Sequence, residues 1–123
     1  MVILNETREL VIAQHVRTAR RFLERLRGLI GTTTLGQGEG LWLPGCQGVH
    51  TFGMAFAIDV LYLDQQNRIV QIVPYMPPHR FGPVVWKAAG VLELPAGTLD
   101  RYAIGVGRPL VFLEVKPEGT AEP

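Results

Sequence analysis

The spacing of apolar residues along the chain predicts many short strands and one helix. The clearest strand is 58–63 (IDVLYL), and a turn at 64–67 leads into a return strand at 68–73. Between residues 17 and 30, apolar side chains recur at the i, i+3, i+4 and i+7 positions that are typical of one face of an amphipathic helix. A strand at 10–16 precedes this helix. Further strands are expected at 41–43, 49–54, 84–86, 91–94 and 110–115, with a proline-rich loop at 74–83 and a short helical turn at 98–104.

This order of elements predicts a mainly β fold. Many short strands with one helix packed on them are typical of a compact β-sandwich or a partly closed barrel. The amphipathic helix, which follows the first strand, would cover an apolar face of a sheet. The length of 123 residues suits a single domain, with its core at about 10–115 and a polar tail at 116–123.

Composition and charge narrow the class of protein. The net charge of +1 gives no sign of a nucleic-acid partner, and we expect none. No apolar run reaches the roughly 18 residues of a membrane-spanning helix, so no membrane partner is expected either. The only cysteine, Cys46, cannot form an internal disulfide, and the first ten residues make a poor signal peptide. These features predict a cytoplasmic location.

The motifs along the chain, taken in order, resemble a known family. They are Arg27-Gly28-Leu29, Gly40-Leu41-Trp42-Leu43, His50-Thr51-Phe52-Gly53-Met54, Ile58-Asp59-Val60 and Val91-Leu92-Glu93-Leu94-Pro95-Ala96-Gly97. Over residues 10–112 the chain resembles the small prokaryotic family called domain of unknown function 192. The resemblance implies a compact β-sandwich-like fold, and it implies no particular activity.

Two carboxylates lie inside otherwise apolar strands. Asp59 shares its face with two leucines, so it needs hydrogen-bond partners near the core. We favour a structural Asp59 that accepts backbone N–H bonds or pairs with an arginine, and the alternative is a pocket carboxylate with a shifted pKa. Glu93 lies on the strand face opposite Leu92 and Leu94. There we favour exposure or an ion pair, and the alternative is the lining of a cleft.

Other polar residues could join these carboxylates. His50, Asp59 and Glu93 could converge as an acid/base set or as a divalent-metal site, with Thr51 next to the histidine. Their spacing matches no compact catalytic or metal signature, so we expect no metal and no cofactor, and a hydrogen-bonded structural histidine is favoured. Cys46 lies four residues before His50, but a small, partly buried thiol is a simpler interpretation than a nucleophile.

Aromatic residues near the proline-rich loop are the other candidates for binding. A loop over a sandwich often forms the wall of a binding site, and aromatic rings stack on sugars and flat ligands. The alternative is that these rings close one end of the core. The residues are Trp42, Phe52, Tyr75, Phe81 and Trp86.

The polar face of the predicted helix is rich in arginine. It could meet phosphate or an acidic partner, although a solvated face is the ordinary explanation. Its basic residues are Arg17, Arg20, Arg21, Arg25 and Arg27.

Together these features favour a non-catalytic β domain that binds a small ligand or a partner. The alternatives are a small acid/base hydrolase that uses the same polar residues, and a protein-interaction module that uses the basic helix face. The sequence names neither a ligand nor an oligomeric state. The candidate ligand-binding residues are His50, Thr51, Asp59, Glu93, Trp42 and Trp86.

Overall fold

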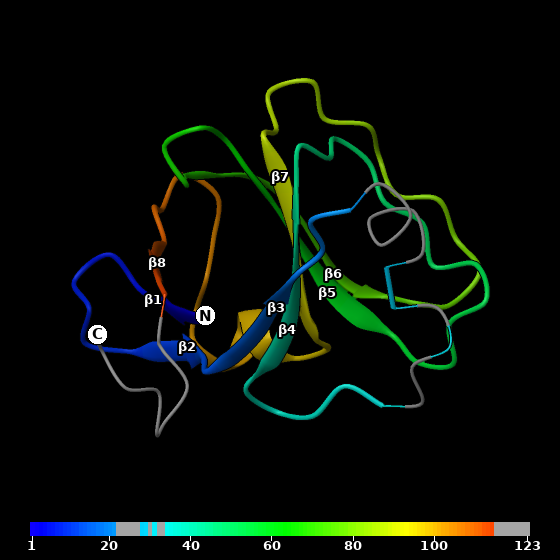
Figure 1. Cartoon of the computed structure of the whole chain (residues 1–123), viewed down its shortest axis with the longest axis horizontal. Coiled ribbons are helices and arrows are strands. Elements are labelled where there is room, and N and C mark those ends of the chain that lie inside the picture. Colours follow the sequence, from blue (N-terminus) through cyan, green and yellow to red (C-terminus); the bar gives the residue numbers. More distant parts are fainter. Residues whose placement is uncertain (22–27, 30, 32–33, 115–123) are drawn as a thin grey trace, which may run out of the picture.

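The computed structural model describes residues 1–21, 28–29, 31 and 34–114 (Figure 1). These residues form two sheets and one short helix, which confirms a mainly β fold, and the strands described do not close into a barrel. Within the same ranges, no helix has the length and apolar character that a bilayer crossing requires. The elements are β1 (Val2–Leu4), β2 (Val11–Ala13), β3 (His15–Thr18), β4 (Glu39–Pro44), β5 (Ile58–Leu63), β6 (Ile69–Met76), β7 (Gly90–Pro95), α2 (Thr98–Arg101) and β8 (Val111–Leu113).

The larger sheet has five strands in the order β3-β4-β7-β5-β6. β3 runs parallel to β4, and the other neighbours are antiparallel. Every residue of β5 is buried, as is every residue of β7 except Pro95. A nearly continuous apolar run of this kind is typical of a strand that is covered on both faces. The two strands that carry Asp59 and Glu93 therefore lie inside the protein.

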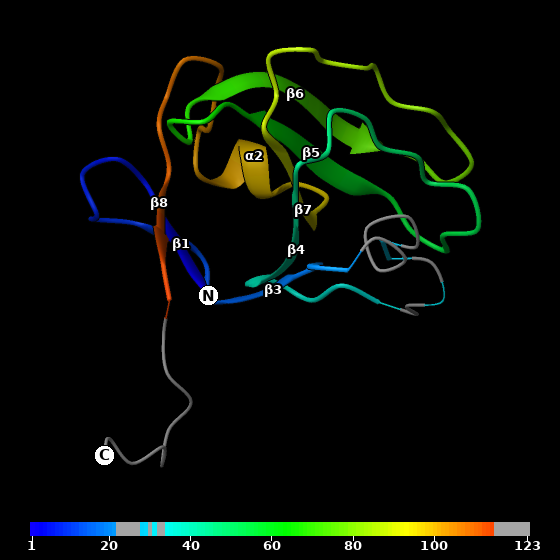
Figure 2. The same cartoon turned by 45° about the horizontal axis from the view of Figure 1, so that its top comes forward.

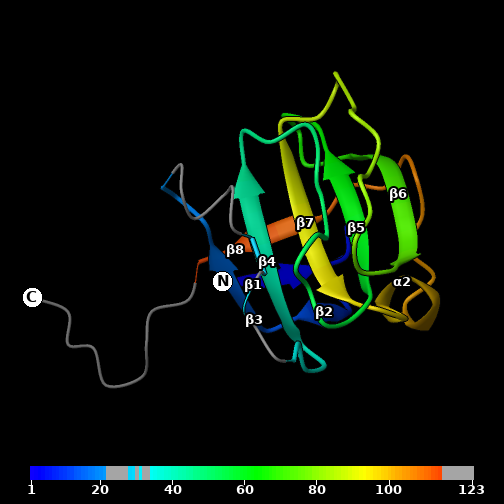
Figure 3. The same cartoon turned by 90° about the vertical axis from the view of Figure 1, so that its right-hand side faces the viewer.

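The smaller sheet covers one face of the larger one. Its order is β2-β1-β8, so β1 pairs with strands from both ends of the described chain. Its strands cross behind those of the larger sheet (Figure 3), and α2 packs between the sheets through Leu99 (Figure 2). The buried residues of this first cluster are Ile3, Ile12, Ala13, Val16, Leu61, Leu63, Ile69, Leu92, Leu94, Leu99 and Leu110.

Loops, and not a sheet, cover the opposite face. The backbones of residues 47–51 and 79–85 are hydrogen bonded side by side, and we call residues 47–54 and 77–86 together the loop ribbon. Side chains of this ribbon pack on the sheet and complete a second apolar cluster. Its buried residues are Ala19, Leu29, Leu41, Leu43, Met54, Ile58, Val60, Tyr62, Met76, Ala88 and Val91.

The predictions around the first helix need correction. The strand expected at 10–16 is two strands, β2 and β3, which break at Gln14 and enter different sheets. Arg17 and Thr18, expected to begin the helix, belong to β3. Residues 22–27 and 30 of the helix expected at 17–30 lie outside the described residues.

Other boundaries differ for identifiable reasons. β6 continues through Pro74 into the expected loop, which is possible because β6 is an edge strand with no neighbour on one side. The strands expected at 49–54 and 84–86 are instead parts of the loop ribbon, where only His50 and Phe81 form an isolated bridge. The short helical turn near residue 98 is confirmed as α2.

Candidate functional site

The larger sheet places Asp59 and Glu93 on opposite faces. Asp59 pairs across the ladder with Leu94, whereas Glu93 pairs with Val60. Successive side chains of a strand point to opposite sides, so each carboxylate shares the side of its own ladder partner. Asp59 therefore faces the smaller sheet and Glu93 faces the loop ribbon. The structure does not bring these two candidates into one pocket.

Asp59 is fully buried and fully engaged with backbone. Its exposed fraction is 0%. Its Oδ1 accepts a hydrogen bond from the N–H of Tyr75 at 2.9 Å. Its Oδ2 accepts from the N–H groups of Gly97 at 3.1 Å and Leu99 at 2.9 Å. Bonds of this kind are what the structural interpretation of Asp59 expects, because three backbone N–H groups already bond to its two oxygen atoms.

The local backbone explains why three donors meet at Asp59. The β5–β6 ladder is irregular between Ile58 and Val60, and Tyr75 opposite has a left-handed φ of 50°. This bulge removes the Tyr75 N–H from the regular ladder. The N-cap of α2 is Gly97, which has no side chain to bond the free N–H groups of the first turn. Asp59 therefore accepts hydrogen bonds both from the bulge and from the N-terminal end of α2.

Glu93 is buried almost as deeply, but no backbone N–H of the described residues is bonded to it in this way. It is 2% exposed, and among the described residues its Oε2 has no hydrogen-bond partner. Its ladder neighbours are Leu41 and Val60, and a Cβ added to Gly28 would lie 3.7 Å from its Oε1. Burial in these apolar surroundings raises the pKa of Glu93 to about 8, so the side chain is mostly protonated at neutral pH. The exposure expected from the sequence is wrong because β7 is a central strand covered on both faces.

Tyr62 lies on the same face and connects the sheet with the loop ribbon. Its hydroxyl donates to the carbonyl oxygen of Pro83 at 2.8 Å. Burial, and after it the nearby charge of Glu93, raises the pKa of Tyr62 to about 12. The hydroxyl therefore remains protonated and holds Pro83 in place.

Thr51 fixes the two halves of the loop ribbon. It is 0% exposed, and its Oγ1 donates to the carbonyl of Pro77 at 2.6 Å and accepts from the N–H of Arg80 at 3.0 Å. Its own N–H donates to the Arg80 carbonyl at 2.9 Å, and its carbonyl accepts from the N–H of His79 at 2.9 Å. Thr51 thus positions the neighbouring residues and is not itself accessible.

Two phenylalanines and two histidines gather on the outside of the ribbon. The rings of Phe52 and Phe81 have centroids 4.7 Å apart, and Phe52 lies 6.1 Å from the ring of His50 and 6.4 Å from that of His79. Nδ1 of His50 accepts from the N–H of Phe52, and Nδ1 of His79 accepts from the N–H of Gly53, both at 3.3 Å. We call these four residues the aromatic cluster. His79 was not among the sequence candidates, although it stands in the proline-rich loop, directly before Arg80 and Phe81.

Trp86 stands on the same segment, five residues after Phe81. Its side chain is 79% exposed and that of Phe81 is 80% exposed. The backbone below is held firmly, because Nε2 of Gln47 donates to the Trp86 carbonyl at 2.9 Å and the N–H of Val85 donates to the Gln47 carbonyl at 2.8 Å. Large apolar side chains thus stand in water on a hydrogen-bonded backbone.

Trp42 lies elsewhere. It packs against the first cluster, and its ring meets Phe112 edge-on at 4.9 Å. It also covers Gly90, where an added Cβ would come within 2.2 Å of the indole. Trp42 therefore has a packing position between the sheets, away from the face of the loop ribbon.

The remaining chemical candidates contribute little to this surface. Cys46 is half-buried and packs against the second cluster. Within the described ranges, no three His, Cys, Asp or Glu side chains gather in a metal-binding group. Of the basic residues expected on the helix face, Arg17 belongs to β3, and Arg20 and Arg21 are exposed just after it. Arg25 and Arg27 lie outside the described residues.

Comparisons with known proteins agree with the fold and are silent on activity. Residues 2–112 match the model of the DUF192 family, which is described as uncharacterised. A UPF0127 protein of Thermococcus sibiricus is 29% identical over 126 residues, covering 99% of this chain and 80% of the relative. A solved structure of a protein of unknown function from Novosphingobium aromaticivorans has a TM-score of 0.74 at 20% identity, covering 90% of this chain and 82% of that one. A structure from Sinorhizobium meliloti, of a candidate transcription regulator, has a TM-score of 0.72 at 20% identity and covers 89% of each chain. At this identity the two structures support the fold alone.

Proposed function

Because the chain belongs to the DUF192 family, whose members are uncharacterised, we propose a function from its own geometry: a non-catalytic domain that binds a small ligand or a partner through the aromatic cluster and Trp86. One observation carries the proposal. Phe81 and Trp86 are 80% and 79% exposed on a segment whose backbone is fixed by hydrogen bonds. Exposed aromatic rings on a rigid scaffold bind with little loss of conformational entropy.

The charge of the ribbon favours one kind of ligand. Residues 45–58 contain no acidic residue, and residues 77–87 contain none either. The first acid after the earlier segment is Asp59, which is buried.

 The basic and imidazole side chains of the two segments are His50, His79, Arg80 and Lys87. A ligand with a flat face and an anionic or hydrogen-bond-accepting edge, such as an acidic sugar, complements this surface.

The sequence candidates take different parts in this proposal. Trp86 and His50 would contact the ligand, together with His79, which was not among the sequence candidates. Thr51 would position them, because it is buried at the centre of the ribbon. Glu93 lies beneath the same face of the sheet and would be reached only by a ligand that enters behind the ribbon.

The other interpretations have less support. An acid/base hydrolase that uses Asp59 and Glu93 together needs both groups at one site, and the sheet separates them. An interaction module that uses the basic helix face has less support, because Arg17 belongs to β3 and because Arg25 and Arg27 lie outside the described ranges. A cytoplasmic location and the absence of a nucleic-acid partner stay predictions.

The two tryptophans allow a direct test. In ¹H–¹⁵N NMR spectra each indole N–H gives its own signal, and the chain has only Trp42 and Trp86. Titration with neutral and acidic oligosaccharides should shift the Trp86 indole and the Phe81 backbone signals while the Trp42 indole stays in place. Trp86→Ala should weaken binding at least about tenfold, as expected for an aromatic residue at the centre of a contact.

A matched control separates this surface from general stickiness. Val106 is 60% exposed on a turn outside the ribbon, so Val106→Ala should leave binding unchanged. Perturbations spread evenly over both indoles, or a Trp86→Ala protein that binds like the wild type, would contradict the proposal.

A further inference from the structure

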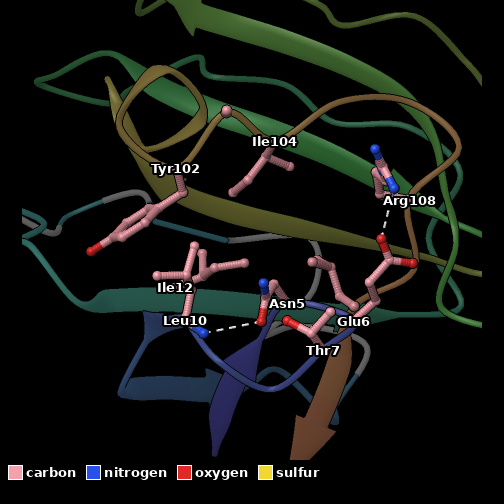
Figure 4. A pocket seen from close by; sticks show the side chains of 10 residues that line it. Asn5, Glu6, Thr7, Leu10, Ile12, Tyr102, Ile104 and Arg108 are labelled. Atoms are coloured by element: carbon pink, nitrogen blue, oxygen red, sulfur yellow. Dashed lines mark hydrogen bonds and ion pairs between the residues drawn. The ribbon is translucent and has the colours of Figure 1, made fainter.

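A pocket with a volume of about 230 Å³ lies away from the loop ribbon, beside the smaller sheet (Figure 4). One side is the connection between β1 and β2, and the other is the segment that follows α2. None of its residues was a candidate from the sequence. Its lining residues are Asn5, Glu6, Thr7, Leu10, Ile12, Tyr102, Ala103, Ile104, Arg108 and Leu110.

The inner wall of this pocket is apolar. Ile12 and Leu110 are buried members of the first cluster, and Ile104 packs against that cluster. Leu10, at the edge, is 44% exposed, which is high for a leucine beside a core. An apolar body placed against this wall would remove hydrocarbon surface from water, which is favourable by roughly 25 cal/mol for each Å² buried.

Asn5 gives the pocket a hydrogen-bond donor of known direction. Its Oδ1 accepts from the N–H groups of Glu9 and Leu10, both at 3.0 Å. These two bonds fix which end of the side-chain amide is oxygen, so the opposite end is the NH₂ group. Figure 4 shows that nitrogen directed into the pocket.

Arg108 adds a positive charge at the rim. Its Nη1 lies 2.8 Å from Oε1 of Glu6, and the two side chains are 71% and 38% exposed. A guanidinium group has five N–H donors, so this pair leaves others for a second acceptor. An ion pair this exposed contributes little to stability, and a ligand can compete for it at small cost.

We propose that this pocket binds a small monocarboxylic acid with an apolar body. The body packs on Leu10, Ile12 and Ile104, and the carboxylate accepts hydrogen bonds from the Asn5 amide and from Arg108. The site is separate from the aromatic cluster and does not depend on the function proposed above.

Three ligands that share one ring test the chemistry. Phenylacetate, phenylacetamide and phenethylamine differ in the charge of the polar end, and NMR signals of Thr7 and Ala103 report on the pocket. We expect saturable shifts with phenylacetate at millimolar concentration, weaker binding of the amide and weakest binding of the amine. The Trp86 indole should stay in place throughout, which separates this site from the one on the ribbon.

Two variants distinguish a binding role from a structural one. Arg108→Gln and Glu6→Gln both remove the same ion pair, so a structural effect would change binding in the same direction in both. We expect Arg108→Gln to weaken phenylacetate binding at least tenfold and Glu6→Gln to strengthen it severalfold, because the glutamate competes for Arg108. Equal binding of the three ligands, tighter binding of the amine, absence of saturation, or parallel changes in the two variants would overturn the proposal.

Discussion

Each face of the larger sheet buries one carboxylate, and the two faces accommodate it in different ways. Asp59 and Glu93 stand on neighbouring strands, and both are withdrawn from water. Asp59 accepts three backbone N–H bonds, so its negative charge is compensated by groups that would otherwise lack partners. Glu93 has no such donors among the described residues and is held mostly protonated by its surroundings. The comparison shows that the role of a buried carboxylate depends on the hydrogen-bond donors around it and not on its burial alone.

The largest effect is expected at Asp59. Asp59→Ala leaves the N–H groups of Tyr75, Gly97 and Leu99 without an acceptor, and each such loss costs about 1–3 kcal/mol. We therefore expect the free energy of unfolding to fall by about 3–6 kcal/mol, measured by urea denaturation. Asp59→Asn, which keeps one acceptor oxygen, should lose less. A loss below about 1 kcal/mol in Asp59→Ala would show that the three bonds carry little weight.

The next effect is a dependence on pH that comes from Glu93. Its pKa rises from 4.5 to about 8 on folding, so between these values the folded state holds a proton that the unfolded state has released. The free energy of unfolding should therefore have its full value below pH 4.5. It should fall by up to roughly 1.4 kcal/mol for each pH unit as the pH rises toward 8. Urea denaturation across this range measures the slope.

The control for this slope is Glu93→Gln, which has the same shape and cannot titrate. Its stability should match that of the wild type below pH 4.5 and should not show the added decline at higher pH. Identical pH profiles for the two proteins would mean that Glu93 titrates normally in the folded state.

The smallest effect is a gain in stability. Glu93→Leu replaces a buried carboxyl group, whose Oε2 has no partner among the described residues, with an apolar side chain of similar size. Such replacements are often neutral or stabilising by about 1–4 kcal/mol. We expect a gain of about 1–2 kcal/mol at pH 7 by urea denaturation. A clear loss would show that the carboxyl group has a stabilising contact, and the comparison with Asp59 would then weaken.

The fold was largely predictable from the sequence, because alternation and turn residues are local signals. The apolar run of β5 and the turn after it identify the hairpin with β6 directly. β1 was missed, since three apolar residues next to the chain start give no period to recognise. The single strand predicted at 10–16 was wrong because nothing in an apolar run marks the residue at which the chain changes sheets.

The site was only partly predictable. The sequence identified Asp59 as a residue that needs polar partners, and the structural interpretation matches its bonds. It did not show that Glu93 lies on the other face from Asp59, because this follows from the register of β5 against β7. The pocket beside the smaller sheet was not predictable at all, since Asn5 and Arg108 are brought together only by the pairing of β1 with β8.

That pairing also affects how the protein is made. Ile3 is paired with Phe112, so β1 leaves the ribosome well before its partner strand does. The smaller sheet cannot be completed until then, and such distant contacts carry a loop-closure cost that slows folding. Meanwhile the first apolar strand is exposed on the growing chain, where it is open to capture by a chaperone or to aggregation.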